Sequence, residues 1–69
     1  MKLKSRIGIV IEEKGYKKKW VAQQIGVSQN VLSRWINDVS MPSIVSCFKL
    51  AELLECKVDD LFTITKRNI

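Results

Sequence analysis

Apolar residues recur at helical spacing along most of the chain, and the clearest example is residues 28–37. At about 100° per residue, one side of a helix over this stretch carries the apolar residues Val31, Leu32, Trp35 and Ile36. The opposite side carries only polar residues, namely Gln29, Asn30, Ser33, Arg34 and Asn37. This division predicts a helix with one face in a core and the other in water.

The residues directly before this helix predict another one, over residues 18–25. Its inward stripe consists of Val21, Ala22 and Ile25. Gly26 suits the left-handed conformation that ends many helices, and Ser28 can cap the next helix by accepting a backbone N–H. Two helices that cross at such a short turn form a helix-turn-helix unit.

The rest of the chain predicts three further helices, over residues 1–14, 43–55 and 58–62. The first has an apolar face of Leu3, Ile7, Val10 and Ile11. The second has an inward stripe of Ile44, Cys47, Phe48, Ala51 and Leu54, in which Phe48 is expected to contact Trp35. Leu50 and Leu53 broaden this stripe, which indicates a second contact surface. Residues 63–69 have no fixed pattern, so we expect a frayed tail, or else a short strand that pairs across a dimer.

The polar face of residues 28–37 carries side chains suited to reading DNA. Amides and guanidinium groups have paired donors or acceptors that match base edges in the major groove. An ordinary solvated face would also be polar, but such faces usually mix Lys with Glu, and this face contains neither. The candidate base-reading residues are therefore Gln29, Asn30, Ser33, Arg34 and Asn37.

The run GYKKKWVAQQIGVSQNVLSRWIN, followed by Pro42 and by LAELLECKVDDLF, resembles the phage-repressor-like helix-turn-helix family (Cro, lambda-repressor and Xre-type proteins). The similarity covers about residues 7–62. It implies an all-α, compact five-helix, lambda-repressor-like domain with the helix-turn-helix at helices 2 and 3. It also implies a sequence-specific regulator of transcription that binds double-stranded DNA and acts as a repressor. The chain departs from the family pattern at Lys17 and Lys18, at Ile36, and at Asp38, where a glycine is common.

Charge supports a nucleic-acid partner, because residues 1–20 carry seven basic and two acidic side chains and so hold the whole net charge of +5. Lys17, Lys18 and Lys19 surround the start of a predicted helix, where the helix dipole favours an anion. They are candidate phosphate contacts, although such runs often serve only solubility. Further phosphate candidates are Ser28 and, by the family resemblance, Ser40 and Ser43; local capping is the alternative role for all three.

Several kinds of chemistry are excluded by composition. The chain has no histidine and no Cys-x-x-Cys spacing, so we expect no metal, no cofactor and no enzymatic activity. Cys47 and Cys56 are expected to be reduced, buried thiols. No small-molecule ligand is evident. Without a signal peptide or a run of about 18 apolar residues, the sequence predicts a cytoplasmic protein, at the nucleoid when DNA-bound, and no membrane partner.

The expected organisation is one DNA-binding domain, residues 1–62, with a tail of residues 63–69. A homodimer on DNA is a further expectation, since helix-turn-helix proteins commonly bind two half-sites. The alternative function is a protein-interaction module, such as an antirepressor or an antitoxin-like partner. Trp20 bears on this choice, because it lies opposite the buried stripe of its helix. It either covers Tyr16 and lysine stems or anchors a partner protein.

Overall fold

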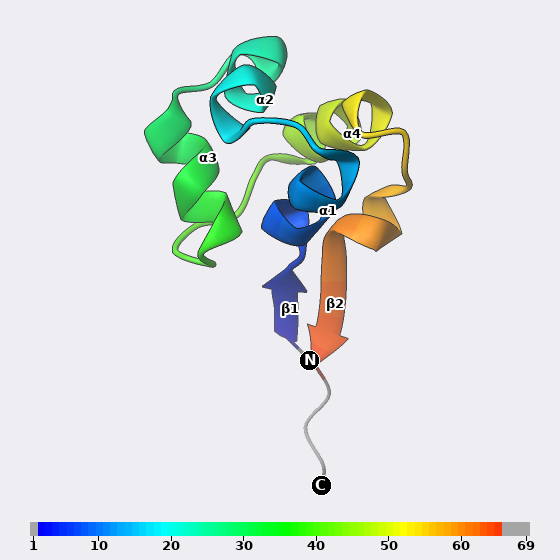
Figure 1. The fold of residues 1–69 in the computed structure, drawn as a ribbon. Coiled ribbons are helices and arrows are strands. Elements are labelled where there is room, and N and C mark those ends of the chain that lie inside the picture. The colour runs from blue at the N-terminus through cyan, green and yellow to red at the C-terminus, as the bar shows by residue number, and fades with distance from the viewer. Residues whose placement is uncertain (1, 66–69) are drawn as a thin grey trace, which may run out of the picture.

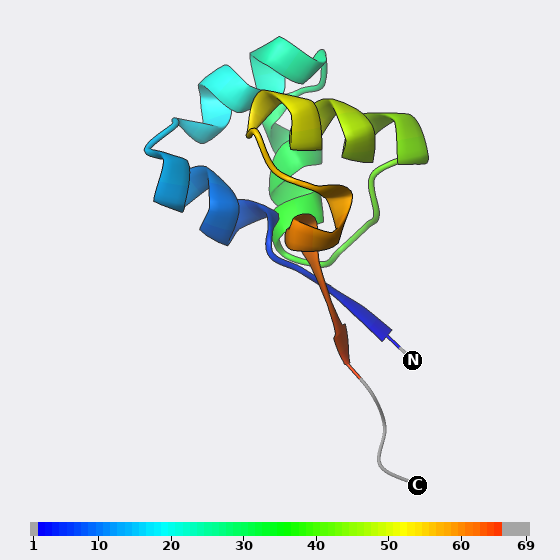
Figure 2. The ribbon, with the colours of Figure 1, turned by 90° about the vertical axis from the view of Figure 1, so that its right-hand side faces the viewer.

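Four α-helices and a two-stranded sheet make up residues 2–65, the part of the chain that the computed structural model describes. In chain order the elements are strand β1 (Lys2–Ser5), helices α1 (Ile7–Lys14), α2 (Lys18–Ile25), α3 (Gln29–Ile36) and α4 (Ile44–Leu53), 3-10 helix η1 (Val58–Leu61) and strand β2 (Phe62–Thr65). Figures 1 and 2 show that the helices gather into one body, from which the two strands project side by side.

The two ends of the described chain pair with each other, and this corrects the expected all-α, five-helix fold. Strands β1 and β2 are antiparallel, with Leu3 opposite Ile64 and Lys4 opposite Thr63. Residues 2–5 are therefore a strand rather than the start of the first helix. The predicted fifth helix over residues 58–62 is the shorter 3-10 helix η1.

The expected tail is also corrected where the structure describes it. Residues 63–65 belong to β2 and pair with β1 of the same chain, so they are not frayed. The expected domain boundary at residue 62 thus falls inside a strand, and residues 66–69 lie outside the described residues.

The core draws on every helix and on η1. Its fully buried side chains are Ile7, Ile11, Val21, Leu32, Leu50, Leu54 and Leu61. Gly15 and Gly26 end α1 and α2 with φ angles of 76° and 77°, which a side chain would make costly. Both helix ends therefore lie where the sequence predicts them. None of the helices within residues 2–65 has the length and apolar content that a membrane crossing requires.

Helix α4 packs with a different face from the predicted one. Its buried side chains are Cys47, Leu50, Ala51 and Leu54, so two members of the predicted stripe are wrong. Ile44 and Phe48 lie in solvent, and Phe48 is not the core partner expected for Trp35. Because α4 is apolar on nearly every side, its periodicity does not identify which side the other helices cover.

Candidate nucleic-acid interface

Helix α3 is fixed at its start by the turn that follows α2. The backbone N–H of Val27 donates to Ala22 O at 3.0 Å, and Gly26 supplies the left-handed residue. The Ser28 hydroxyl then accepts a hydrogen bond from Val31 N at 3.1 Å, which satisfies one of the free N–H groups at the helix start. The predicted cap is therefore confirmed.

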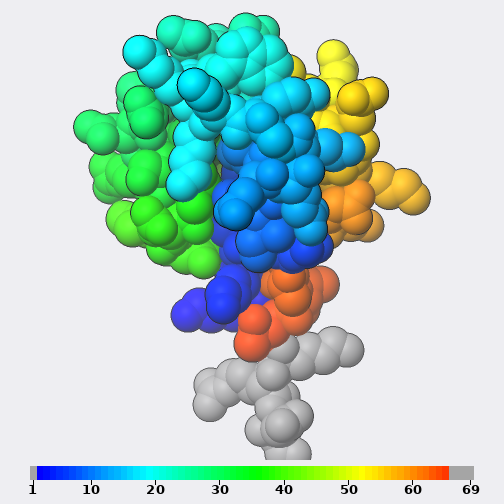
Figure 3. Space-filling model, in the orientation of Figure 1, coloured from blue at the N-terminus to red at the C-terminus, as the bar shows by residue number. Residues whose placement is uncertain are grey.

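The two faces of α3 separate as the sequence predicts. Leu32 and Trp35 are buried, and Val31 and Ile36 are partly buried against the core. All five candidate base-reading residues are exposed: Gln29, Asn30, Ser33, Arg34 and Asn37. Among them, Asn37 Nδ2 donates to Ser33 Oγ at 3.4 Å. In the space-filling view α3 (green) forms one margin of the molecule, so its polar side chains are open to a large ligand (Figure 3).

The end of α3 is tied to strand β1 by Asp38. This residue adopts a left-handed conformation, with φ of 61°, and the N–H of the next residue, Val39, donates back to Arg34 O at 2.9 Å. The Asp38 carboxylate accepts a hydrogen bond from Ser5 N at 2.9 Å. Asp tolerates left-handed geometry better than most residues. Asp38 therefore adopts the left-handed conformation for which the family commonly uses glycine, and its side chain also accepts a hydrogen bond from β1. The sequence does not predict this second role.

The three lysines surround the start of α2 as expected. Lys17 is the N-cap residue, Lys18 and Lys19 lie in the first turn, and all three are exposed. No side chain of the described residues caps this end, and its first turn holds no acidic residue. The free N–H groups and the helix dipole there attract an anion. Figure 3 shows the first part of α2 (cyan) beside α3 (green) on the same face.

Trp20 lies against Tyr16, as the structural alternative predicts. Their ring centroids are 4.9 Å apart at an interplanar angle of 45°. Trp20 remains 39% exposed, so its neighbours cover only part of this side chain. Its position next to the lysines adds an amphipathic surface to this end of α2.

Two of the three serine candidates, Ser28 and Ser43, make local side-chain hydrogen bonds. Ser43 Oγ caps α4 by accepting from Ser46 N at 3.1 Å and also donates to Ser46 Oγ at 3.1 Å. Ser28 caps α3, and Ser40 is partly buried. Capping thus occupies one lone pair of Ser28 and leaves its proton free for a further acceptor.

The two cysteines do not form a disulfide with each other. Cys47 is buried, Cys56 is partly buried, and both are free thiols. Burial raises the pKa of both thiols; at Cys56 the Asp60 carboxylate raises it further, while Lys14 opposes this. Within residues 2–65 no cluster of side chains could hold a metal ion.

Comparison with known proteins places this arrangement in a family. A helix-turn-helix family model matches residues 7–61. Seven chains among solved structures match significantly. One is the crystal structure of a Bacteroides fragilis protein provisionally described as DNA-binding, with 37% identity and a TM-score of 0.85 over 90% of this chain and 100% of that one. No curated protein sequence matches. The chain therefore belongs to the Xre- and lambda-repressor-type helix-turn-helix family.

Proposed function

We propose that the protein is a sequence-specific regulator of transcription that binds double-stranded DNA and acts as a repressor. Membership of the helix-turn-helix family supports a DNA-binding regulator, as does a structural neighbour described in those terms. In this proposal α2 and α3 are the helix-turn-helix unit, and α3 lies in the major groove.

The observation that carries the proposal is the polar face of α3. It presents two amides, a hydroxyl, a guanidinium and a third amide, all exposed, on a helix whose other face is buried. Arg34 is suited to the O6 and N7 acceptors of a guanine, whereas Gln29, Asn30 and Asn37 are suited to the N6 and N7 atoms of an adenine. The absence of a carboxylate from this face spares it repulsion from the phosphates.

The phosphate contacts are proposed on either side of that face. Lys17, Lys18 and Lys19 are exposed at the start of α2, where the helix dipole adds to their charge. The hydroxyls of Ser28 and Ser40 are proposed as weaker donors to phosphate oxygens, and that of Ser43 as a donor that would first give up its bond to Ser46 Oγ. Such contacts set the affinity and the position of the protein on the duplex, but carry no sequence information themselves.

Two copies bound to one duplex would read a longer DNA sequence than one copy can. A helix of eight residues such as α3 spans only a few base pairs, so one copy specifies a short sequence. Two copies on half-sites about 34 Å apart, one turn of the duplex, double the length that is read. Repression then needs nothing more than occupation of a site that the transcription machinery must use.

The test is selection from a random duplex pool, followed by titration of an enriched and a scrambled duplex at two salt concentrations. We expect one sequence pattern to be enriched. Affinity for both duplexes should fall with salt by about 0.9 log units per log unit of salt for each neutralised phosphate, with a constant gap between them. If no sequence were enriched and both duplexes bound equally well, the protein would bind DNA only non-specifically, through its positive charge.

A further inference from the structure

Strands β1 and β2 form a ribbon whose two faces differ in chemistry. Residues directly opposite each other in an antiparallel pair lie on the same face, and neighbours along a strand alternate between the faces. The register therefore places Lys2 and Lys4 of β1 on one face, with Thr65 and Thr63 of β2 opposite them. All four residues are exposed, and we call them the lysine face of the ribbon. The other face carries the remaining residues of the two strands, namely Leu3, Ser5, Phe62 and Ile64.

Two hollows in the surface show which way each face is turned. Leu3 and Ile64 line a hollow of about 500 Å³ beside η1. Lys4 lines a different hollow, of about 280 Å³, together with Asp38 just after α3 and Lys18 at the start of α2. In Figure 3 β1 (dark blue) lies below α3 (green), on the same face as the start of α2 (cyan). The lysine face is therefore turned toward the side of the molecule that carries the proposed DNA contacts.

Strand β1 is held next to the end of α3 by a direct hydrogen bond. The backbone N–H of Ser5 donates to the Asp38 carboxylate at 2.9 Å, and Asp38 directly follows Asn37, the C-cap residue of α3. Pairing with β2 fixes β1 along its other side. Because the ribbon is tied to the end of the proposed DNA-reading helix, we expect a duplex bound by α3 to pass the lysine face.

The positive charge of the lysine face is not neutralised within the ribbon. Residues 2–5 and 62–65 contain no Asp or Glu, and each lysine has a threonine as its cross-strand partner. The hollow beside Lys4 is electrically balanced, since Glu12 and Asp38 line it as well. The excess positive charge therefore lies on the ribbon itself, where two ammonium groups on one face repel each other. An anion bound to this face would relieve that repulsion.

We propose that the lysine face of the ribbon is a second phosphate-binding surface, which holds the DNA backbone beside the end of α3. The inference rests on the DNA binding in the proposed function and extends its contact surface to β1. Lys2 and Lys4 are about 7 Å apart along the strand, and each strand of a duplex carries a phosphate about every 3.4 Å along the axis. Both ammonium groups can therefore bind phosphates of the same DNA strand. Such contacts add affinity and fix the position of the duplex, but do not select its sequence.

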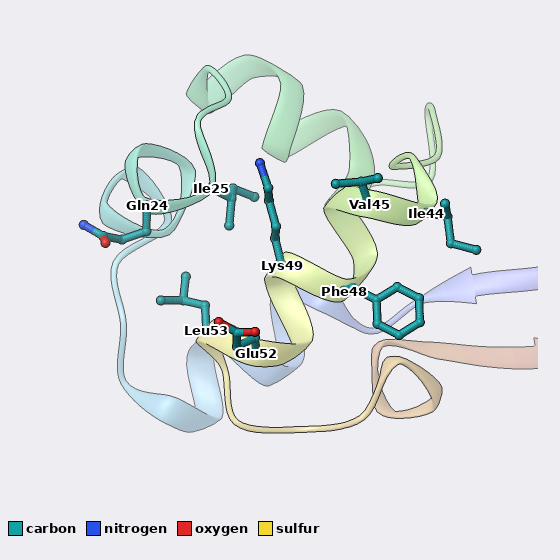
Figure 4. A pocket seen from close by; sticks show the side chains of 8 residues that line it. All are labelled: Gln24, Ile25, Ile44, Val45, Phe48, Lys49, Glu52 and Leu53. Atoms are coloured by element: carbon teal, nitrogen blue, oxygen red, sulfur yellow. The ribbon is translucent and has the colours of Figure 1, made fainter.

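The first test compares the salt dependence of duplex binding for two double variants of the full chain. Lys2→Gln/Lys4→Gln removes both charges of the lysine face and keeps the length of the side chains. Lys49→Gln/Lys57→Gln is the matched control, because it removes the same charge from exposed lysines elsewhere. Figure 4 shows Lys49 leaving α4 into the hollow between α2 and α4, which shares no residue with the hollow beside Lys4, and Lys57 lies just before η1.

The proposal predicts different results for these two variants. On any duplex, the log–log salt slope of Lys2→Gln/Lys4→Gln should be smaller than that of the unchanged chain by about 1.8, and its affinity at about 0.1 M salt should be at least roughly tenfold weaker. The control should keep the slope of the unchanged chain. A slope for Lys2→Gln/Lys4→Gln that equals the slope of the control would overturn the proposal.

The second test locates the contact on the unchanged chain. Limited acetylation by acetic anhydride, measured by mass spectrometry of peptides, should slow severalfold at Lys2 and Lys4 when a duplex is bound. The exposed Lys49 and Lys57 should react as fast as they do without DNA. Equal reactivity of Lys2 and Lys4 with and without the duplex would overturn the proposal.

Neither test needs a preferred DNA sequence, so this inference and the proposed function can fail separately. If no sequence is enriched from a random pool, sequence-specific reading fails, while the slope difference and the protection of the two lysines still measure the ribbon contact. If a sequence is enriched, Lys2→Gln/Lys4→Gln should select the same pattern with lower affinity. A changed pattern would overturn the assignment of the lysine face to phosphates, because it would mean that these side chains contact bases.

Discussion

Gly8 of α1 lies so close to Ile36 of α3 that a Cβ atom added to Gly8 would be 2.8 Å from Cγ2 of Ile36. Real Cβ atoms essentially never approach another side chain so closely. The last turn of the proposed DNA-reading helix thus rests on the first turn of α1, and the absence of a side chain at Gly8 sets their separation. From the sequence alone, a glycine inside a helix indicates only a local weak point, and not this close contact.

Gly8→Ala should destabilise the protein despite the better helix propensity of alanine. Alanine gains about 0.5–1 kcal/mol over glycine in a helix. Overpacking a close contact costs about 1–3 kcal/mol, because Cγ2 is fixed directly to the Ile36 Cβ and moves only if the side chain rotates. We expect the free energy of unfolding, from urea denaturation, to fall by about 1 kcal/mol.

The matched experiment repeats the substitution in an Ile36→Ala background. Ile36→Ala alone loses buried apolar surface, but it also removes Cγ2. Gly8→Ala should then be neutral or stabilising, so the two substitutions should couple by about 1 kcal/mol or more. Additive effects would mean that the contact between Gly8 and Ile36 does not limit the approach of the two helices.

Asp38 provides a second link to α3, and its substitutions should separate conformation from hydrogen bonding. Asp38→Ala loses the bond from Ser5 N and places an ordinary residue at φ 61°, so we expect a loss of about 2 kcal/mol. Asp38→Gly keeps the conformation and should lose about 1 kcal/mol. Asp38→Asn keeps both features and should lose least. The same loss for all three variants would contradict these separate roles.

The sequence predicts α2, α3 and their turn well because each of these helices has a single apolar stripe. Ser28 and Gly26 mark the helix boundaries with local chemistry that needs no tertiary information. The exposure of all five candidate base-reading residues follows from the same periodicity. Their contact with bases stays a prediction, since no bound DNA bears on it.

The pairing of the strands and the full buried face of α4 do not follow from the sequence, because distant contacts decide them. Leu3 and Ile7 are four residues apart, a helical spacing, yet residues 2–5 alternate as Lys-Leu-Lys-Ser and pair with residues 62–65 near the other end of the chain. In α4 the apolar residues surround most of the helix, so local periodicity allows either Phe48 or Leu50 to face the core. Packing against the other helices buries Leu50 and leaves Phe48 outside.

The lysines at the start of α2 should act on affinity and leave base preference unchanged. Lys17→Ala and Lys18→Ala should each reduce the salt slope of DNA binding by about 0.9 and weaken enriched and scrambled duplexes equally. Lys57→Ala is the matched control, because it removes the same charge just before η1, away from α3. If Lys57→Ala reduced the slope equally, net charge rather than contact at α2 would explain the binding.

Because of the two thiols, the free energy of unfolding should fall as pH becomes alkaline. Burial raises the pKa of Cys47, and burial together with Asp60 raises that of Cys56. The unfolded chain therefore loses its thiol protons at lower pH than the folded chain does. The protonated thiols therefore contribute to the free energy of unfolding. Their contribution is fully present below the thiol pKa of the unfolded chain and is lost as pH rises through the thiol pKa of the folded chain.

Urea denaturation between about pH 7 and about pH 10, under reducing conditions, measures this effect. Cys47→Ala/Cys56→Ala serves as the reference, because it differs from the unchanged chain only at the two thiols. The unchanged chain should lose more of its free energy of unfolding than the reference does. Parallel curves for the two proteins would contradict a raised thiol pKa in the folded state.

The central claim, that the polar side of α3 reads base edges, is tested most directly by comparing the sequences that different variants select from one random duplex pool. Arg34→Ala should lose preference at one base position of each half-site, at a cost of about 1–3 kcal/mol on the best sequence, and keep it elsewhere. Lys18→Ala should select the same sequences as the unchanged chain, only more weakly. Selection of an identical pattern by the Arg34→Ala protein, with equal discrimination at every position, would contradict the account.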